Sequence, residues 1–256
     1  MSLSVDEARV RVILLDIEGT TTSVDFVYQT LFPYARQHVE EFLGLHRGDA
    51  SVNENIEQLR AGQASDAQQG LAPPVWQEES VERQFESAVR YVEWLMDRDR
   101  KSTALKLLQG RIWEAGYRSG QLRGEVYADV PLAFSRWRRQ RREICIFSSG
   151  STLAQKLLFQ TTPTGDLTRL ITAYFDTTIG AKREAESYHR IAAARGRKPR
   201  EILFISDAVE ELDAARQAGM QTILCVRPGR AGPEREDHAT IETFDPVLIS
   251  DGSDAS

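Results

Sequence analysis

The sequence has few cysteines and no long hydrophobic run. Of its 256 residues only two are cysteines, Cys145 and Cys225, and each stands inside an apolar run. This predicts reduced thiols in a core, in a reducing compartment, rather than a disulfide or a metal–thiolate site. No segment approaches the ~20 apolar residues of a membrane span, and the first residues lack the apolar centre of a signal peptide. We therefore expect a cytoplasmic protein that does not bind a membrane.

The chain also lacks an excess of positive charge. Its 32 lysines and arginines face 38 aspartates and glutamates, for a formal net charge of −6. A general basic field that attracts nucleic acid is therefore not expected, and any phosphate should be held locally by a few residues. We expect a small-molecule partner, no nucleic acid, and a monomer, since no feature of the sequence requires a second copy.

Short apolar runs are what the sequence does contain. They are VRVILLD (10–16), EICIFSS (143–149), EILFISD (201–207) and TILCV (222–226). Amphipathic stretches lie between the later runs, at 151–160, 186–196 and 209–219. Unbroken apolar runs are typical of strands covered on both faces, and their alternation with helices predicts a parallel sheet. The expected fold class is α/β, with a doubly wound parallel sheet.

A long insertion separates the first run from the second. It exceeds a hundred residues, and between 81 and 120 its apolar residues recur every three or four positions, the period of amphipathic helices. We predict an all-helical cap domain. The boundaries expected are 24–128 for the cap and 1–23 with 129–256 for the core.

Two further segments are polar or rich in proline. The stretch 48–70 has few large apolar residues and predicts a mobile connection. The tail after Arg227 carries three prolines and many charges, so it should cross the surface and add a short strand near 247–249.

Polar side chains follow directly after the apolar runs, where an open α/β sheet binds its ligands. The residues concerned are Asp16, Glu18, Ser148, Ser149, Asp207 and, from the irregular strand and loop AYFDTTIGAK, Lys182. Converging carboxylates repel one another unless a cation lies between them, and Mg²⁺ prefers one or two carboxylates with phosphate oxygens. Hydroxyls and an ammonium group can donate to the same phosphate. The set predicts Mg²⁺-dependent phosphoryl transfer.

The strand-end residues also form motifs of a known superfamily. DIEGTTT (16–22) resembles the DxDxT nucleophile motif of the haloacid dehalogenase superfamily, and FSSGS (147–151), Lys182 and ISDAVEELDAA (205–215) resemble its later motifs in the same order. Longer stretches are similar to the enolase-phosphatase family of methionine salvage. These are LLDIEGTTTSVDFVYQTLFPYA (14–35), DRKSTALKLLQGRIW (99–113), YADV (127–130), FSSGSTLAQKLLF (147–159), FDTTIGAKREAESY (175–188) and VRPGRAG (226–232).

The resemblance implies a role for each acid of the first motif. Asp16 would attack phosphorus to form an aspartyl-phosphate and would bind one Mg²⁺ per chain. Glu18 stands where related phosphatases usually have aspartate as general acid and base. Its longer side chain would carry out acid/base work on a diketone phosphate that must first be enolised, and its main-chain carbonyl would bind the metal.

The later motifs supply the remaining candidates. Ser148 and Ser149 would bind the substrate phosphate, Lys182 would neutralise it and hold Asp16 ionised, and Asp207 would be a metal ligand. Glu211 would orient Lys182 or a metal-bound water. The reaction implied is enolisation of a phosphorylated diketone followed by phosphate release.

Other interpretations stay open at this point. Taken alone, Asp16 and the two serines could be helix caps, and Glu18 could simply substitute for aspartate. Phe26, Tyr28, Phe32 and Tyr34 could enclose the substrate's thioether tail or merely pack, and Lys101 could add positive charge to the site. The four histidines, His38, His46, His189 and His238, are assigned no role.

Other functions are also compatible with parts of the sequence. A related phosphatase could act on another small phosphate ester without enolisation. A receiver-type signalling domain is disfavoured because no aspartate ends the second run and a long insertion follows the first. A catalytically inactive binding module is disfavoured by the complete set of charged strand ends.

Overall fold

The computed structural model describes residues 5–100, 102–230 and 237–249. The chain divides into two compact units, which we call the α/β unit (Met1–Phe26 with Arg123–Ser256) and the helical unit (Val27–Leu122). The predicted insertion, 24–128, extends a few residues beyond the helical unit at both ends. The junctions stay with the α/β unit because they are bonded within it; the Tyr127 amide, for example, donates to the Thr21 carbonyl at 3.0 Å.

The α/β unit is built on a parallel sheet of six strands in the order β3-β2-β1-β4-β5-β6. The strands are β1 (Val12–Leu15), β2 (Glu143–Phe147), β3 (Ala173–Phe175), β4 (Ile202–Ser206), β5 (Gln221–Cys225) and β6 (Ala239–Ile241). Central strand β1 is buried at every residue and pairs with β2 on one side and β4 on the other. All four apolar runs therefore form strands, and the irregular strand before Lys182 is β3.

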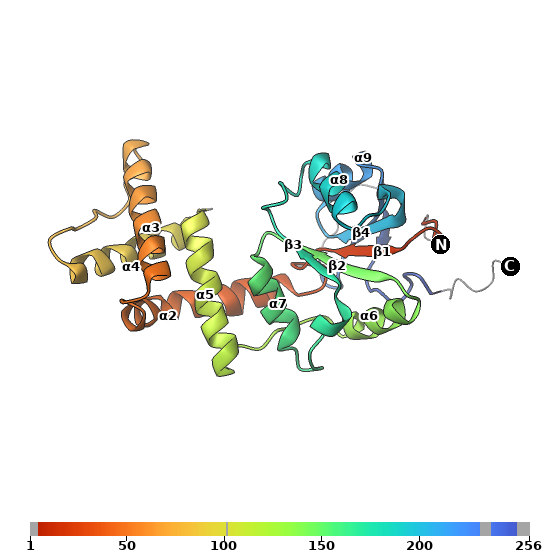
Figure 1. Cartoon of the computed structure of the whole chain (residues 1–256), viewed down its shortest axis with the longest axis horizontal. Coiled ribbons are helices and arrows are strands. Elements are labelled where there is room, and N and C mark those ends of the chain that lie inside the picture. The colour runs from red at the N-terminus through yellow and green to blue at the C-terminus, as the bar shows by residue number, and fades with distance from the viewer. Residues whose placement is uncertain (1–4, 101, 231–236, 250–256) are drawn as a thin grey trace. The chain divides into compact units, whose positions relative to one another are not determined.

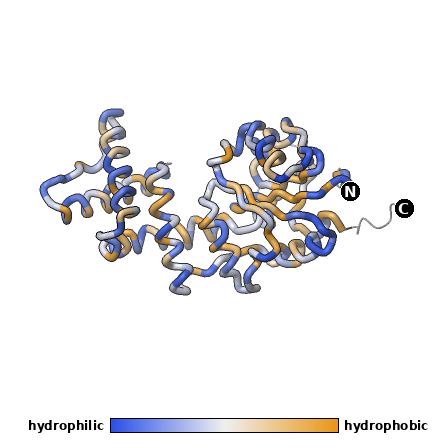
Figure 2. Tube along the Cα trace, in the orientation of Figure 1, coloured by the Kyte–Doolittle hydropathy of each residue, from blue (hydrophilic) through white to orange (hydrophobic). Residues whose placement is uncertain are grey.

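Helices cover both faces of this sheet (Figure 1). Helices α8 (Ala185–Ala194) and α9 (Val209–Gln217) lie on one face, and α6 (Asp129–Arg139) and α7 (Thr152–Gln160) lie on the other. Single 3₁₀ turns, η2 (Thr168–Leu170) and η3 (Pro199–Glu201), precede β3 and β4. The prediction of a doubly wound α/β fold is confirmed. Figure 2 shows the central strands as a hydrophobic centre between helices of mixed hydropathy.

The predicted strand at 247–249 is wrong. The last strand, β6, lies earlier, at Ala239–Ile241, where the Val226 amide donates to the Ile241 carbonyl at 2.8 Å. Val247 and Leu248 are buried in a turn instead, and the Val247 carbonyl accepts from the Trp137 indole at 3.1 Å. Pro246 lacks an amide hydrogen, and Leu248 has a φ of 54°, so this apolar pair cannot continue a ladder.

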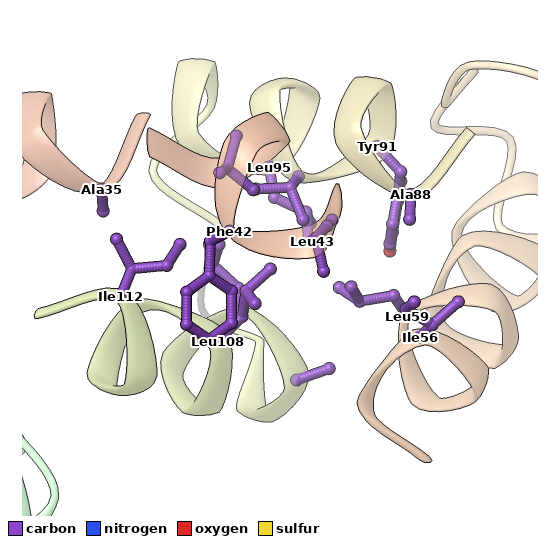
Figure 3. Packing of buried hydrophobic residues seen from close by; sticks show 14 of the residues in the cluster. Ala35, Phe42, Leu43, Ile56, Leu59, Ala88, Tyr91, Leu95, Leu108 and Ile112 are labelled. Carbon is purple, nitrogen blue, oxygen red and sulfur yellow. The ribbon is translucent and has the colours of Figure 1, made fainter. Parts of the chain in front are cut away.

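The helical unit follows the short helix α1 (Val24–Phe26). It contains the π-helical turn η1 (Val27–Leu31) and the helices α2 (Phe32–Leu45), α3 (Ala50–Gln68), α4 (Val81–Asp97) and α5 (Thr103–Ser119). Figure 3 shows their apolar stripes meeting in one core, where Phe42 and Leu43 of α2 lie close to Leu108 of α5 and Leu95 of α4. The amphipathic helices expected between 81 and 120 are α4 and α5.

The prediction of a mobile connection at 48–70 is also wrong, because most of that segment is helix α3. Asp49 caps the helix by accepting from the Ser51 amide at 2.9 Å. The buried face combines Val52, Ile56 and Leu59 with polar residues, so its helical period is hard to recognise from hydropathy. The Asn55 side-chain Nδ2, for instance, donates to the Ala104 carbonyl at 3.0 Å. A polar side chain can face a core when its partner is built in.

Both cysteines are buried and free, and burial raises the pKa of each thiol to about 12. They are therefore inert core residues. In the described part of the chain, every helix is too short or too polar to pass through a lipid bilayer.

Candidate active site

Three neighbouring strands deliver polar side chains to one edge of the sheet. Asp16 follows β1, Ser148 follows β2 and Asp207 follows β4. Because β1 lies between β2 and β4, Asp16 is central. Its amide continues the ladder by donating to the Ile205 carbonyl at 3.0 Å, and its side chain is buried. The backbone thus fixes this carboxylate before any ligand arrives.

A largely buried lysine, Lys182, connects two carboxylates at this edge. The Lys182 Nζ lies 2.5 Å from Asp16 Oδ1 and 2.6 Å from Glu211 Oε2. Burial alone would lower the pKa of Lys182, but the two carboxylates outweigh it and raise the pKa above its ordinary value. The charged form of Lys182 is therefore favoured, and its ammonium lies 2.5 Å from the Asp16 carboxylate, where it can offset negative charge.

The loop that carries Lys182 is held against α8. The Tyr188 hydroxyl donates to the Lys182 carbonyl at 2.7 Å, and the Ser187 hydroxyl donates to the Ala181 carbonyl at 2.7 Å. Gly180 has a φ of 141°, and a Cβ at this position would lie 2.2 Å from Ser187 Oγ. The sequence IGAK thus needs its glycine for the loop to approach α8 and aim the lysine at Asp16.

Glu211 and Asp207 carry more negative charge than the site neutralises. Burial and the charge of Asp16 raise the pKa of Glu211 to about 7, although it is paired with Lys182 and accepts from the Ser206 hydroxyl at 3.1 Å. Burial, Asp16 and, more weakly, Glu18 raise the pKa of Asp207 to about 6. Carboxylates under such mutual repulsion are stabilised by an added cation.

Asp207 touches the loop that follows Asp16. A Cβ on Gly19 would lie 2.1 Å from Asp207 Oδ2, and the Gly19 φ of 74° is left-handed, so only glycine fits. The Arg230 Nη1 lies 3.6 Å from the same Asp207 oxygen and is partly exposed. Asp207 therefore lies against the main chain of Gly19 on one side and the partly exposed guanidinium of Arg230 on another.

Glu18 stands at the start of a closed loop. The amides of Thr20, Thr21 and Thr22 all donate to the Ile17 carbonyl, at 3.2, 2.9 and 2.8 Å, and the three threonines are fully buried. The Glu18 side chain is half-buried, and its charge reaches Asp207. An acid/base group so placed lies in the electrostatic field of the site but keeps access to solvent or substrate.

The two predicted phosphate-binding serines differ in exposure. Ser148 is half-buried; its amide donates to the Phe175 carbonyl at 3.2 Å, and its hydroxyl accepts from the Gly150 amide at 3.2 Å. Ser149 is exposed. Helix α7 is capped by a third serine, Ser151, whose hydroxyl accepts from the Ala154 amide at 3.2 Å. Since Ser151 is the cap, Ser148 and Ser149 are not needed for that purpose.

The donor set suits a hard divalent cation. Within residues 5–100, 102–230 and 237–249, no three histidine, cysteine, aspartate or glutamate side chains form a metal-binding group. Mg²⁺ needs fewer, because it is usually bound by one or two carboxylates with carbonyl oxygens and waters. Asp16 and Asp207 provide two carboxylates, and burial together with the charge of Asp16 raises the pKa of Asp207. The residues present thus fit Mg²⁺.

The remaining sequence candidates are Lys101 and four aromatic residues. Lys101 is outside the described residues. Phe26 is buried in the α/β unit, whereas Tyr28, Phe32 and Tyr34 belong to the helical unit. Phe32 packs edge-on against Tyr28 with ring centroids 5.3 Å apart, and the Tyr34 hydroxyl donates to Gln121 Oε1 at 2.7 Å.

Of the four histidines, one is buried. His238 lies 2.9 Å from the Thr222 hydroxyl and 3.2 Å from Asp213 Oδ1, which makes it part of the packing around β5 and β6. His38 and His46 each bond to the carbonyl four residues earlier, at 2.8 Å. These contacts are structural, and none of them reaches Asp16.

Sequence reasoning missed a buried arginine beside the site. Arg227 is 2% exposed and forms a 2.7 Å ion pair with Asp129, and its guanidinium also donates to the Thr20 carbonyl. The signal was present, because Arg227 stands two residues after β5 and so belongs to the same sheet edge as Asp16. The rule that predicts ligand-binding residues after the first three apolar runs holds for the fourth run as well, since that run is β5.

Comparisons with known proteins agree with this geometry. A family model described as haloacid dehalogenase-like hydrolase matches residues 10–219. The chain is 50% identical to "Enolase-phosphatase E1" of Synechococcus elongatus, over 91% of this chain and 95% of that protein. It is 46% identical to the protein of the same name from Sorangium cellulosum, over 93% and 97%. The crystal structure of the UTR4 protein from Saccharomyces cerevisiae superposes with a TM-score of 0.73 at 34% identity, covering 92% of this chain and 99% of that one.

Proposed function

The chain belongs to the haloacid dehalogenase-like hydrolases, and from this premise we propose that it is a bifunctional enolase-phosphatase of methionine salvage. The substrate is 2,3-diketo-5-methylthiopentyl-1-phosphate. The products are the acireductone 1,2-dihydroxy-3-keto-5-methylthiopentene and phosphate. Relatives that carry the enolase-phosphatase name match nearly the whole chain, which supports both halves of this reaction.

The observation that carries the proposal is the environment of Asp16. Its buried carboxylate follows the central strand and lies 2.5 Å from the Nζ of Lys182, a largely buried lysine whose pKa is raised. A purely structural aspartate would be satisfied by this pair. Here two further acids with raised pKa values, Asp207 and Glu211, surround it, and such clusters mark functional sites.

Asp16 is the proposed nucleophile for phosphate release. One of its carboxylate oxygens forms a bond to phosphorus while the bond between phosphorus and the enol oxygen breaks, which yields an aspartyl-phosphate and an enolate that takes a proton to give the enol. Water then attacks phosphorus, breaks the acyl–phosphate bond and regenerates the carboxylate. Lys182 and the hydroxyls of Ser148 and Ser149 are proposed to bind the phosphate oxygens through both steps.

Glu18 is the proposed acid/base group. Before phosphate transfer, a proton must leave the carbon beside the carbonyl, and an enol must form on the carbonyl oxygen. The half-buried Glu18 carboxylate is longer by one methylene than aspartate, so it reaches further from the main chain toward the substrate carbons. An enol is also a better leaving group than an alcohol, which reduces the need for protonation by an aspartate at this position.

Mg²⁺, one per chain, is the proposed cofactor. Asp16, Asp207 and the main-chain carbonyl of Glu18 are its proposed ligands. When bound, the ion neutralises charge on the transferring phosphoryl group. Lys182 is proposed to neutralise the same charge from the protein side. Glu211, whose Oε2 lies 2.6 Å from the Lys182 Nζ, keeps the lysine oriented toward Asp16.

Residues 24–128, which contain the helical unit, are the proposed cap, and the cap is proposed to exclude water while the substrate is enolised. We further propose that the protein works as a cytoplasmic monomer on a small molecule, without nucleic acid or membrane. The two free, buried thiols support a reducing compartment.

A stopped-flow assay with the diketone phosphate tests the proposal. The enol absorbs in the ultraviolet, so its appearance and the release of phosphate can be followed in the same reaction. We expect the enol to form before phosphate appears, and only with Mg²⁺ present. Phosphate release from simple esters with no enol formed from the diketone would identify a phosphatase without enolase activity instead.

A matched pair of variants separates the two halves of the reaction. Glu18→Asp restores the residue that related phosphatases usually have, so it should lower enol formation more than it lowers hydrolysis of a simple ester. Glu18→Gln, which cannot exchange a proton, should lower both. Equal enol formation in Glu18→Asp and wild type would remove Glu18 from the enolase half.

A further inference from the structure

We propose that Arg227 is a positioning residue that fixes the loop of residues 18–22 and thereby sets the place of the Glu18 carboxylate. The ordering of the loop is argued from contacts alone. Its consequence for catalysis rests on the proposed function, namely on proton transfer by Glu18.

The guanidinium of Arg227 is held in a single orientation. Nε and Nη2 both donate to the Thr20 carbonyl, at 2.8 and 2.5 Å, and Nη1 donates to Asp129 Oδ2 at 2.7 Å and to the Glu242 carbonyl at 3.3 Å. An arginine that is 2% exposed is rare unless it is paired in this way. Its planar fork uses donors on every nitrogen, so it cannot rotate without breaking several bonds.

Two aromatic rings enclose the same guanidinium. Its central carbon lies 4.1 Å from the Tyr127 ring centroid and 4.6 Å from that of Phe244. Asp129 is held in turn, since its Oδ2 also accepts from the Phe244 amide at 2.6 Å. Asp129, the partner of Arg227, is therefore held by the protein as well, and the network of hydrogen bonds keeps the guanidinium in one place.

The loop of residues 18–22 is held at one end by β1 and at the other by Arg227. Its own amides close it upon the Ile17 carbonyl, and the Gly19 amide donates to the Thr22 carbonyl at 2.8 Å. Asp16 is fixed by the β4 ladder, and the Thr20 carbonyl is fixed by Arg227. In sequence, Glu18 stands midway between Asp16 and Thr20, so its main-chain position is restrained from both sides.

The choice of arginine matters because lysine cannot make the same contacts. A lysine ammonium is a single point charge and cannot bridge the Thr20 carbonyl, Asp129 and the Glu242 carbonyl in one plane. Loosening the Thr20 anchor would let the loop move while the ladder at Asp16 stays intact. Displacing a catalytic group by ~1 Å can lower a rate by about 100-fold.

Arg227→Lys tests the inference, with Arg136→Lys as its matched control. Arg136 is also an arginine of the α/β unit that donates to main-chain carbonyls, those of Phe244 at 2.7 Å and Val247 at 3.1 Å. It contacts the Phe244 segment, as Arg227 does, but it donates to no carbonyl of the loop. If Arg227→Lys does not fold, Asp129→Asn replaces it, since that change neutralises the partner and leaves the guanidinium in place.

The first readout is amide hydrogen exchange in the metal-free protein without substrate. We expect the amides of residues 19–22 to exchange about tenfold faster in Arg227→Lys, and those of β1 to remain unchanged. In Arg136→Lys both sets should exchange as in wild type. Unchanged exchange at 19–22 in Arg227→Lys, or equal acceleration in both variants, would overturn the inference.

The second readout is steady-state kinetics of enol formation. We expect kcat to fall about 10- to 100-fold in Arg227→Lys while KM changes little, because the phosphate is bound by other residues. Faster exchange with wild-type kcat would refute a positioning role. If the wild-type protein does not enolise the diketone, the proposed function fails, whereas the exchange result still decides whether Arg227 orders the loop.

Discussion

The α/β unit and the helical unit both bury charge, but they do so in opposite ways. In the helical unit, buried Asp66 accepts from Arg100 at 2.6 Å and from the Tyr91 hydroxyl at 2.8 Å, so its carboxylate is satisfied. At the sheet edge of the α/β unit, two acids, Asp16 and Glu211, share one largely buried lysine. Burial and the charge of Asp16 raise the pKa values of Glu211 and of a third acid, Asp207. The first arrangement stabilises a fold, whereas the second is the one that we propose to bind Mg²⁺ and a phosphate.

Replacing the shared lysine should have the largest effect. Lys182→Met removes the charge that stabilises Asp16, so we expect phosphate release to fall by about 1,000-fold or more. The fold should survive near pH 5, where Glu211, with a pKa of about 7, can be protonated. Kinetics and circular dichroism at about pH 5 and about pH 8 check this. Near-normal turnover would show that the shared cation is only structural.

The backbone next to Asp207 should be the second most sensitive point. Gly19→Ala places a methyl group where the structure has an Asp207 oxygen, at 2.1 Å, and it strains a φ of 74°. We expect about a 100-fold loss of kcat/KM with weaker Mg²⁺ binding, measured by calorimetry. Gly165→Ala is the matched control, because that glycine also has a positive φ, of 103°, but open space around it. Equal loss in both variants would attribute the effect to strain alone.

The helical unit should respond in stability rather than in chemistry. Asp66→Ala leaves the Tyr91 hydroxyl without its acceptor, and we expect the free energy of unfolding to fall by about 1–3 kcal/mol. Asp97→Asn removes the charge of an exposed ion pair with Arg36, and it should change the free energy of unfolding by less than about 0.5 kcal/mol. Urea unfolding and Mg²⁺ titration are the measurements. A large change in Mg²⁺ affinity in Asp66→Ala would contradict the claim that the buried charge of the helical unit serves stability alone.

The smallest expected effect concerns pH. Asp207 has a pKa of about 6 when folded, against 3.8 ordinarily, so the folded state holds its proton more tightly. In the metal-free protein this contribution to stability is present below the ordinary pKa and is lost as pH rises through about 6. Asp207→Asn should therefore be relatively more stable than wild type at about pH 8 than at about pH 4, by thermal melts. The opposite trend would contradict the repulsion described for the site.

The parts of the fold that could be predicted from sequence are those with an uninterrupted pattern. The apolar runs at β1, β2, β4 and β5 predict buried strands. In α4 and α5 the apolar residues recur with the regular period of a helix. Helix α3 was missed because Asn55, Gln63 and Asp66 occupy its buried face, where their partners come from other segments. Such partners are invisible until the chain is folded.

The candidate site was predictable for a similar reason, since parallel strands bring their carboxyl ends together. That rule, with the motif resemblance, located Asp16, Asp207 and Lys182. It did not reveal that Gly19 touches Asp207 or that Arg227 reaches Thr20, because both contacts join loops far apart in sequence. Loop-to-loop contacts depend on main-chain geometry, which residue patterns do not encode.

The central claim is that the Asp16 carboxylate attacks phosphorus, and Asp16→Asn tests it most directly. The variant should be compared with wild type in the presence of Mg²⁺, with enol absorbance and phosphate release recorded from the same sample. We predict that the enol phosphate still forms and accumulates, while phosphate release disappears. Phosphate release near the wild-type rate in Asp16→Asn would contradict the account.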